Sequence, residues 1–383
     1  VAGTHGKTTT TGMIAHVLMA AGLDPGFIVG GEVRTLGTNA RAGDGAIFVI
    51  EADEYDNMFL GTRPQVAVIT NIEHDHPDQF PDRGAVAAAF AAFVLQLPEE
   101  GVLVVCADDV GARALGNAWR AAGRKALFYG CAHPRADWRA VDLEARANSG
   151  NPQGGMDVAA NTFSAQRWGR ALGAVRLRVP GCHNALNALA ALAVADHFGV
   201  AFETASEALA AFEGVGRRFE VRGEAGGVTV IDDYAHHPTA IRATLAAARA
   251  RYPGRTLWAV WQPHTYSRTR ALLDDFASAF GDADRVIVTD IYAARERDTL
   301  GLCGADVAAR LSAERGDDAA SRSVQHVGGD PWGRLALPEV VEAIMAGRTG
   351  DDVVLVMSAG DAVQVSELLL ARLRALDADE AAG

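Results

Sequence analysis

The first nine residues have the composition and spacing of a loop that binds phosphate. They read Val1-Ala2-Gly3-Thr4-His5-Gly6-Lys7-Thr8-Thr9 and continue into a stretch with helical spacing. In such a loop the backbone N–H groups at a helix start form a nest for an anion, and the lysine adds a charge for the β- and γ-phosphates. The Thr8 hydroxyl is placed to ligate Mg²⁺. We predict binding of a nucleoside triphosphate by Gly3, Thr4, Gly6, Lys7, Thr8 and Thr9.

The loop departs from the strict pattern G-x-x-x-x-G-K-[ST] at one position. Val1 stands where that pattern has glycine, so the chain carries the shorter form G-x-x-G-K-T. The alternative is a threonine-rich helix start with an accidental lysine. That alternative is weak because Gly, Lys and Thr all occupy the positions that the mechanism needs.

Two acidic runs follow predicted strands, where a nucleotide-bound Mg²⁺ would find a carboxylate. They are Glu51-Ala52-Asp53-Glu54-Tyr55-Asp56 and Asn71-Ile72-Glu73-His74-Asp75-His76. Either run alone is more typical of a solvated loop. The segment His74-x-His76-x-Asp78 also suits a dinuclear metallohydrolase, but Gln79 stands where such a site wants another histidine. A hydrolase also leaves the phosphate loop unexplained.

Three later segments could bind nucleotide or substrate. In Pro180-Gly181-Cys182-His183-Asn184-Ala185-Leu186-Asn187, two amides one helical turn apart could contact an adenine or ribose edge, or cap the helix. The remaining two segments are Asp232-Asp233-Tyr234-Ala235-His236-His237-Pro238 and Gln262-Pro263-His264-Thr265-Tyr266-Ser267-Arg268-Thr269-Arg270. Their histidines and arginines indicate an anionic substrate and proton handling. The alternative is capping residues on surface loops.

The elements that must position these residues alternate between strand and helix. Predicted strands are Ala46–Ile50, Val66–Thr70, Val102–Ala107, Val228–Ile231, Leu257–Trp261, Val286–Thr289 and Val353–Met357. Predicted helices are Thr8–Ala21, Ala85–Leu97, Ala185–Phe198, Pro238–Tyr252, Arg270–Phe280 and Val363–Leu376. This alternation predicts an α/β fold with mostly parallel sheets covered by helices on both faces. Ligands then bind at the carboxyl ends of the strands, which here carry Glu51, Asn71, Asp232, Asp233, Gln262, Asp290 and Ser358.

The alternation is interrupted at two places. From Pro134 to Pro180, turn residues around Ser149–Gly155 and the alternation of Val175–Val179 predict a small antiparallel sheet. Near Phe212–Gly216 a helix ends in glycines and a second α/β series begins. We therefore predict a phosphate-loop domain at residues 1–215, which includes the antiparallel sheet, and a Rossmann-like domain at residues 216–383.

Composition limits the classes of partner. The 383 residues hold 35 basic and 48 acidic side chains, a net charge of −13, which opposes binding to nucleic acid or to an anionic membrane. The four cysteines show no metal-ligand spacing, and no apolar stretch approaches the ~20 residues that span a bilayer. We expect a cytoplasmic protein with free thiols and with no membrane or nucleic-acid partner. A homodimer is compatible with this composition.

Taken together, these motifs resemble the ATP-dependent Mur ligases of bacterial peptidoglycan synthesis, and among them the members that add L-alanine. The resemblance covers nearly the whole chain. Its carriers are Gly3–Thr11, Glu51–Glu54, Thr70–Glu73 with Asp75 and His76, Gly181–Asn187, Gly216–Phe219, Asp232–Pro238 and Gln262–His264. It implies that ATP and Mg²⁺ convert the carboxylate of UDP-N-acetylmuramate into an acyl phosphate, which the amine of L-alanine then attacks.

The resemblance also implies a role for each matching residue. Lys7 and Mg²⁺ would neutralise the two anions, and Thr8, Glu51 and His76 would ligate the metal. Asn71 would lie beside the reacting carboxylate. Adenosine would be held by His183, Asn184, Asn187, Arg218 and Asp233. The substrate carboxylate and the incoming alanine would be positioned by Tyr234, His236, His264 and Arg268.

Several departures from the family pattern leave the function open. Tyr55 stands where many alanine-adding members carry serine. A tyrosine at this position also resembles the murein-peptide-recycling ligases. Thr265 replaces a frequent second arginine, and no lysine between Lys7 and Lys125 is available for the carbamylated lysine of some sister ligases. Family members begin with a uridine-nucleotide-binding domain, whereas this sequence starts at the phosphate loop, so we expect a truncated sequence. A P-loop ATPase that is not a ligase and a non-catalytic nucleotide-binding remnant are two further interpretations.

Overall fold

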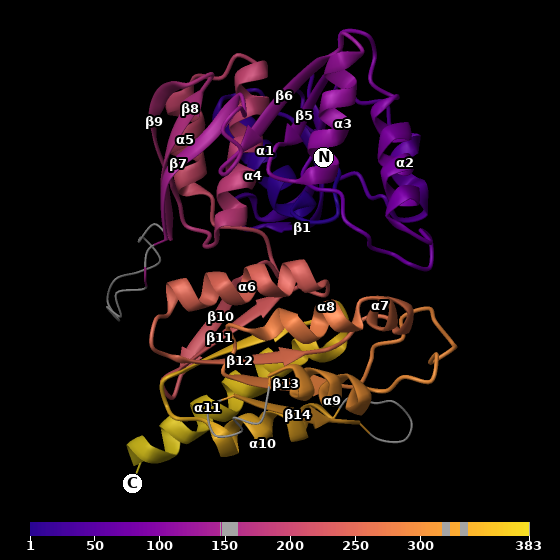
Figure 1. Ribbon diagram of the computed structural model, residues 1–383. Helices are drawn as coiled ribbons and strands as arrows, with labels where there is room; N and C mark the ends of the chain where they lie inside the picture. Colours follow the sequence, from indigo (N-terminus) through magenta and orange to yellow (C-terminus); the bar gives the residue numbers. More distant parts are fainter. Residues whose placement is uncertain (146, 148–159, 316–321, 330–335, 383) are drawn as a thin grey trace. The chain divides into compact units, whose positions relative to one another are not determined.

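The computed structural model describes residues 1–145, 147, 160–315, 322–329 and 336–382 (Figure 1). The chain divides into two compact units, Val1–Gly216 and Arg217–Gly383, which we call unit 1 and unit 2. None of the helices in the described ranges combines the length and the apolar composition needed to span a bilayer. The predicted turn around Ser149–Gly155 lies outside the described residues.

Unit 1 contains a three-stranded and a six-stranded sheet, with strand orders β2-β1-β3 and β4-β5-β6-β7-β8-β9. Residues Val1 and Ala2 link the two sheets, because Ala52 N donates to Val1 O (2.8 Å) and Ala2 N donates to Val68 O (2.8 Å). The strands are β1 (Gly26–Val33), β2 (Thr38–Arg41), β3 (Phe48–Ile50), β4 (Val66–Ile69), β5 (Val102–Cys106), β6 (Lys125–Gly130), β7 (Trp138–Ala145), β8 (Asn161–Arg167) and β9 (Arg170–Leu177). The phosphate loop therefore begins between the two sheets.

Two helices of unit 1, α1 (Lys7–Ala20) and α4 (Cys182–His197), show little amphipathic contrast because they are buried on most of their surface. Helix α1 packs against α4 and α5 (Phe202–Ala211). Thr8–Leu18 of α1 and Ala188–Ala195 of α4 are buried without interruption, as expected of helices covered on all sides. The remaining helices are α2 (Arg83–Val94), α3 (Val110–Ala121) and the 3-10 helices η1 (Arg34–Leu36) and η2 (Tyr55–Gly61).

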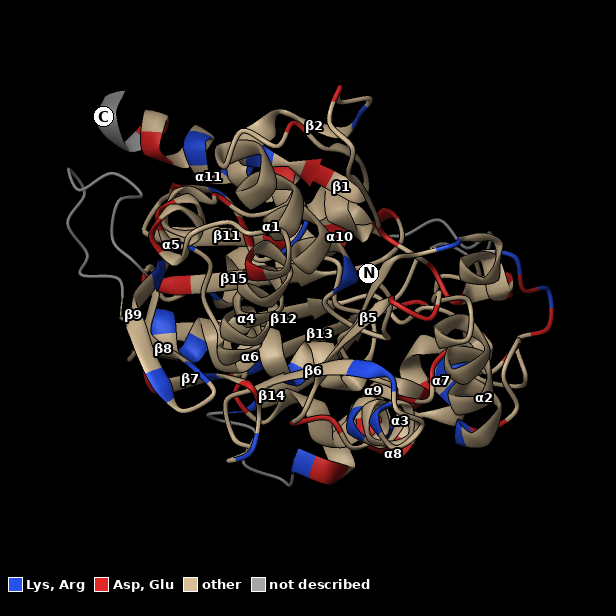
Figure 2. Ribbon diagram, turned by 90° about the horizontal axis from the view of Figure 1, so that it is seen from above, with Lys and Arg blue, Asp and Glu red and all other residues tan. Residues whose placement is uncertain are grey.

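The predicted antiparallel strands form, but they continue the parallel sheet instead of making a separate one. Strands β4 to β7 pair in parallel, whereas β7, β8 and β9 pair antiparallel. Strand β9 is the outer edge, and Figure 2 shows basic residues on it and on β8. The exposed Arg170 of β9 pairs with Arg167 of β8, and the exposed Arg176 pairs with Thr162. Charged side chains on an edge strand disfavour pairing with another chain.

Unit 2 is a six-stranded sheet with order β10-β11-β15-β12-β13-β14, in which β10 alone pairs antiparallel among the described strands. Its strands are β10 (Glu220–Ala225), β11 (Val228–Asp233), β12 (Thr256–Trp261), β13 (Arg285–Thr289), β14 (Ser323–Val327) and β15 (Asp352–Met357). Its helices are α6 (Pro238–Arg251), α7 (Tyr266–Ala271), α8 (Leu273–Ala277), η3 (Ser278–Phe280), α9 (Gly304–Arg315), α10 (Leu337–Gly347), η4 (Asp361–Val363) and α11 (Gln364–Ala382).

Helices cover both faces of the unit 2 sheet, as the alternation predicts (Figure 1). Successive residues of β12 point to opposite faces: Leu257 and Trp261 pack with α6, α8 and α9, whereas Trp258 and Val260 pack with α10 and α11. Each face has its own apolar cluster.

Predicted and observed elements differ in a few places. Each of the seven predicted strands is present, but β1, β2, β6, β10 and β14 are not predicted. Glycines interrupt the apolar pattern of β1, and the apolar run of β6 is short and bounded by a lysine and a glycine. The predicted helix Arg270–Phe280 is wrong. Leu272 leaves the helical conformation (φ −115°, ψ 20°), so the segment divides into α7, α8 and η3.

Candidate functional site

The phosphate loop of unit 1 requires glycine at two positions. Gly3 (φ 139°) and Gly6 (φ 78°) have backbone conformations that other residues rarely adopt. A Cβ on Gly3 would lie 1.9 Å from Thr70 Oγ1, and a Cβ on Gly6 would lie 2.8 Å from Asn187 Oδ1. The two glycines thus allow close approach of the end of β4 and of α4 to the loop.

The segment after β4 fastens the loop. Asn71 Oδ1 accepts from His5 N (2.8 Å), Asn71 Nδ2 donates to His5 O (3.2 Å), and Thr70 Oγ1 donates to the same carbonyl (2.6 Å). Glu73 N donates to Thr4 Oγ1 (2.9 Å). Asn71 therefore supports the loop backbone, and its contact with a reacting carboxylate stays a prediction.

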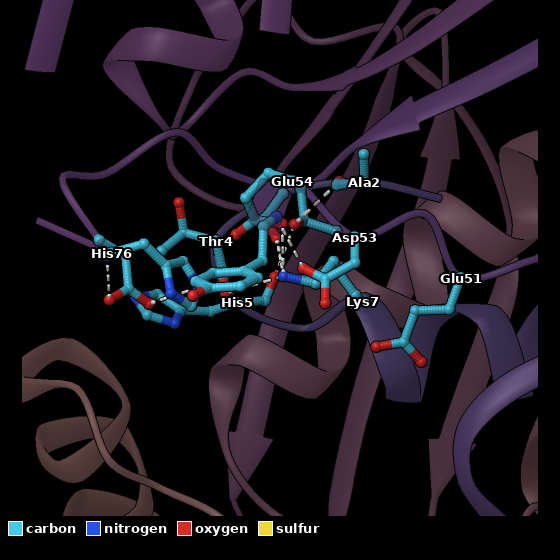
Figure 3. A network of polar contacts seen from close by, with 12 residues as sticks. Ala2, Thr4, His5, Lys7, Glu51, Asp53, Glu54 and His76 are labelled. Carbon is cyan, nitrogen blue, oxygen red and sulfur yellow. Dashed lines mark hydrogen bonds and ion pairs between the residues drawn. The ribbon is translucent and has the colours of Figure 1, made fainter. Parts of the chain in front are cut away.

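Lys7 lies at the centre of a polar network (Figure 3). Its Nζ lies 2.7 Å from Glu54 Oε2 and donates to Gly3 O (2.7 Å). The Glu54 side chain is only 3% exposed, so its carboxylate is buried against the lysine. Burial by itself lowers the pKa of Lys7, but the charge and hydrogen bond of Glu54, with Asp53 and Glu51, raise that pKa above its ordinary value. Lys7 is therefore a charged ammonium group, as phosphate binding needs.

The predicted metal ligands lie in two places. Thr8 Oγ1 donates to Glu51 Oε1 (2.9 Å), and Glu51 Oε2 accepts from Gly30 N (2.6 Å). His76 is grouped with Asp53 and Glu54, and one ligand atom from each of these three residues lies within 4.8 Å of the other two. Figure 3 shows Glu51 and His76 at opposite ends of the network, with Lys7 between them. A hydroxyl and carboxylates are ligands that Mg²⁺ prefers.

Tyr55 contacts the same group. Its ring meets that of His76 edge-on at 4.9 Å, and its hydroxyl donates to Asp78 Oδ2 (3.0 Å). His76 has a positive φ of 54°, and its N–H donates to Asp75 Oδ1 (2.7 Å). Backbone and side chain of His76 are thus both constrained.

The paired amides at the start of α4 connect that helix to α1. Asn184 Nδ2 donates to Pro180 O (2.6 Å), Asn187 Nδ2 donates to Asn184 Oδ1 (3.0 Å), and Thr10 Oγ1 donates to Asn187 Oδ1 (3.0 Å). Both amides are buried. They have a structural role in this arrangement, and their contact with adenosine stays a prediction.

His183 lies beside the two amides on the first turn of α4. Burial lowers the pKa of His183 to about 4, so its imidazole is neutral at physiological pH. Its Nδ1 is buried and finds no hydrogen-bond partner within the described ranges. Such an atom is available to a ligand.

Thr9, which is also among the residues predicted to bind the nucleotide, lies on the first turn of α1 and is buried.

In unit 2, the carboxylate of Asp233 accepts hydrogen bonds from nearby backbone N–H groups. Its Oδ2 accepts from Phe219 N (2.8 Å) and its Oδ1 from Ala235 N (2.7 Å). The side chains of Arg217 and Arg218 lie over the ring of Tyr234, 5.1 and 5.0 Å from its centroid. The predicted nucleotide residues Arg218 and Asp233 and the predicted substrate residue Tyr234 therefore share one corner of unit 2.

Three predicted substrate residues of unit 2 lie side by side. The His236 ring is 5.1 Å from Tyr234 and 5.9 Å from His264, measured between centroids. His236 Nδ1 lies 2.8 Å from Tyr234 O, which fixes the ring orientation. Arg268 is buried, and its Nη1 donates to His264 O (2.7 Å). The ends of β11 and β12 thus bring together imidazoles and a guanidinium, groups that suit an anionic substrate.

Two family models match this chain. That of the Mur ligase middle domain matches residues 1–195, and that of the Mur ligase, glutamate ligase domain matches residues 217–360. The chain belongs to the Mur ligase family. The two matched ranges correspond to the two α/β series that the sequence shows.

Curated relatives and a solved structure agree with this membership. This Mur ligase is 48% identical to the UDP-N-acetylmuramate--L-alanine ligase of Frankia casuarinae, over 82% of this chain and 65% of that protein. It is 41% identical to the ligase of the same name from a Geobacter species, over 98% of this chain and 76% of that protein. The crystal structure of UDP-N-acetylmuramate-alanine ligase MurC from Thermotoga maritima matches with a TM-score of 0.75 and 27% identity, over 97% of this chain and 74% of that chain. The Mur ligase chain thus spans 65% and 76% of the two curated relatives.

The sequence predicts no individual role for two carboxylates of this Mur ligase. Glu54 stands in the same acidic run as Glu51, but only the structure shows that it pairs with Lys7. Glu296 binds the turn that carries His264 and Arg268. A carboxylate in the loop after β13 gives no signal of its own in the sequence.

Proposed function

We propose that this Mur ligase chain uses ATP to join L-alanine to the carboxylate of UDP-N-acetylmuramate, a step of peptidoglycan synthesis. The observation that carries the proposal is the placement of Lys7, Thr8 and Glu51 around one glycine-rich loop. Identities of 41% and 48% to curated UDP-N-acetylmuramate--L-alanine ligases support the choice of substrate and amine.

The proposed reaction has two balanced stages. A carboxylate oxygen of the sugar substrate attacks the γ-phosphorus of ATP, the bond to the β-phosphate oxygen breaks, and ADP leaves. The amine nitrogen of L-alanine then attacks the acyl carbon, inorganic phosphate leaves, and the nitrogen loses a proton. The first stage requires two anions to approach each other, and the positive charge of Lys7 lowers the repulsion between them.

Mg²⁺ fits the residues of unit 1. The Thr8 hydroxyl and the Glu51 carboxylate lie 2.9 Å apart, and Asp53, Glu54 and His76 form a second set of oxygen and nitrogen donors. These residues would hold the ion, which when bound supplies positive charge to the phosphates. In unit 2, His236, His264 and Arg268 would orient the substrate carboxylate and the amine.

The test is release of phosphate from ATP as a function of both substrates. We expect release that requires UDP-N-acetylmuramate and L-alanine together, with formation of the alanyl amide. Because the chain spans 65% of the Frankia relative, the assay is run on this chain and on the chain joined to the unmatched part of that relative. Phosphate release that ignores both substrates in both proteins would instead identify an ATPase that is not a ligase.

A second candidate function is ligation of a murein peptide in place of L-alanine. It is favoured by Tyr55, because many alanine-adding members carry serine at this position. The ring of Tyr55 lies against that of His76. The same assay separates the two functions when L-alanine is replaced by the tripeptide L-alanyl-γ-D-glutamyl-meso-diaminopimelate. We expect turnover with L-alanine, and a preference for the tripeptide would establish the second candidate.

A further inference from the structure

One carboxylate of unit 2 binds the turn between β12 and α7 at three points. Glu296 Oε1 accepts from the hydroxyl of Thr265 (2.6 Å) and from that of Ser267, and its Oε2 accepts from Ser267 N (3.0 Å). Thr265 precedes α7, yet its side chain makes no capping hydrogen bond. Glu296 therefore supplies an acceptor that the first N–H groups of the helix need.

The two residues that Glu296 binds lie between two predicted substrate residues. His264 precedes Thr265, and Arg268 follows Ser267. Arg268 Nη1 donates to His264 O (2.7 Å) and lies 3.1 Å from His264 Nδ1, so these two residues hold each other in place. A displacement of Thr265 or Ser267 must therefore move His264 and Arg268 as well.

The segment that carries Glu296 contacts the same turn at its other end. The ring of Tyr292 is stacked on that of His264, with centroids 5.5 Å apart and planes at 11°. Tyr292 N donates to Pro263 O (2.8 Å). Residues 292–296 thus hold residues 263–267 through a ring at one end and a carboxylate at the other.

The ionisation of Glu296 suits this role. Partial burial raises the pKa of its carboxyl, but the hydrogen bonds from Ser267 and Thr265 lower that pKa by more, so the net pKa lies below its ordinary value. An ionised carboxylate only accepts hydrogen bonds, and here three donors face it. Neither glutamine nor alanine can accept all three bonds in the same geometry.

We propose that Glu296 is a positioning residue for the incoming L-alanine. Through Thr265 and Ser267 it holds His264 and Arg268 in the arrangement that receives this amino acid. Glu296 itself touches neither substrate nor nucleotide in this role. The inference rests on the proposed function, because that function assigns His264 and Arg268 to the substrate carboxylate and the amine.

The test compares Glu296→Ala and Glu296→Gln with the control Glu342→Gln. Glu342 lies on α10, is 63% exposed, and pairs with Arg372. In Glu296→Ala we expect the KM for L-alanine to rise about tenfold or more, because small misplacements of positioning groups have large effects, while the KM for ATP stays within about twofold. Glu296→Gln should show a smaller rise, because its amide oxygen still accepts one or two of the bonds. An unchanged KM for L-alanine, or an equal rise of both KM values, would overturn the inference.

A second measurement needs no substrate. In Glu296→Ala, hydrogen exchange at the Ser267 amide should be about tenfold faster or more, because its acceptor is lost, while exchange in Glu342→Gln stays as in the unaltered protein. Equal protection in Glu296→Ala and the unaltered protein would also overturn the inference. If the unaltered protein shows no release of phosphate that depends on L-alanine, the proposed function fails and this inference fails with it. If it does show such release and the Glu296 variants match it, only this inference fails.

Discussion

The ammonium group of Lys7 lies 2.7 Å from the Glu54 carboxylate, and the exposed fractions of the two side chains are 14% and 3%. The lysine bonds Glu54 Oε2, whereas Glu54 Oε1 is buried and has no hydrogen-bond partner in the described part of the chain. The ammonium group that the phosphate loop offers to a nucleotide is therefore already paired with a carboxylate inside unit 1. Removing either partner leaves the other charge buried, so stability and chemistry are linked at this pair.

Lys7→Ala should abolish formation of the acyl phosphate, measured by trapping with hydroxylamine. It should also lower the free energy of unfolding by about 3 kcal/mol, because Glu54 remains buried without its partner. The double variant Lys7→Ala/Glu54→Gln should recover most of that stability, measured by urea unfolding, but none of the chemistry. Lys125→Ala is the matched control, because Lys125 is the only other lysine of the sequence and is exposed. Trapped product from Lys7→Ala at the unaltered level would contradict the role of Lys7.

Gly6→Ala should weaken ATP binding, because the added Cβ would lie 2.8 Å from Asn187 Oδ1 and the φ of 78° strains any other residue. Gly123→Ala is the matched control, because Gly123 has nearly the same φ (77°) but an added Cβ there would have no atom within 4 Å. We expect Gly123→Ala to keep the ATP affinity of the unaltered chain, because Gly123 lies outside the phosphate loop. Isothermal titration with ATP measures both variants. Equal affinities of Gly6→Ala and the unaltered chain would show that the loop does not bind nucleotide in this conformation.

Glu51→Gln should raise the Mg²⁺ concentration needed for half-maximal phosphate release by about tenfold or more. Glutamine can keep one of the two bonds to Thr8 and Gly30 but loses the charge that attracts a cation. A Mg²⁺ titration at fixed ATP measures this shift, and Glu99→Gln, at an exposed position, serves as control. A Mg²⁺ requirement equal in both variants would exclude Glu51 as a ligand.

His236→Ala should slow attack of the amine more than it weakens nucleotide binding. A positioned acid or base contributes about 10²–10⁴-fold, and the ring of His236 is fixed by Tyr234 O, 2.8 Å from its Nδ1. Hydroxylamine should still trap the acyl phosphate while release that depends on L-alanine falls by at least about tenfold. His197→Ala, at the end of α4 in unit 1, is the control. A loss of ATP affinity alone would show that His236 has another role.

Asp232 gives unit 2 a dependence of stability on pH. Burial raises the pKa of Asp232 to about 6, against the attraction of Arg217, whose Nε lies 3.4 Å from Asp232 Oδ2. The folded state therefore binds a proton that the unfolded state has released between about pH 4 and 6, and stability falls as pH rises through this window. Relative to Asp232→Asn, the free energy of unfolding should fall by about 3 kcal/mol from about pH 4 to 7, measured by urea unfolding. A constant difference between the two proteins would contradict this assignment.

The chemistry of the loop and the type of fold follow from the order of the amino acids alone. Gly3, Gly6, Lys7 and Thr8 act through local backbone geometry, so their spacing is informative without a structure. The seven predicted strands also follow from local pattern, because a buried parallel strand is a short apolar run. Polar residues after those runs include His264, which the structure places near His236.

The partners of these residues, in contrast, depend on how the chain packs. Glu51 and Glu54 are both acidic residues after β3, and folding alone directs Glu54 to Lys7 and Glu51 to Thr8. The amides of Asn184 and Asn187 bind protein because α4 packs on α1, and the bond from Thr10 to Asn187 joins residues 177 positions apart. Glu296 reaches Ser267 for the same reason, since neighbouring parallel strands bring their following loops together. Pairings of this kind arise from contacts between distant segments, which no local pattern encodes.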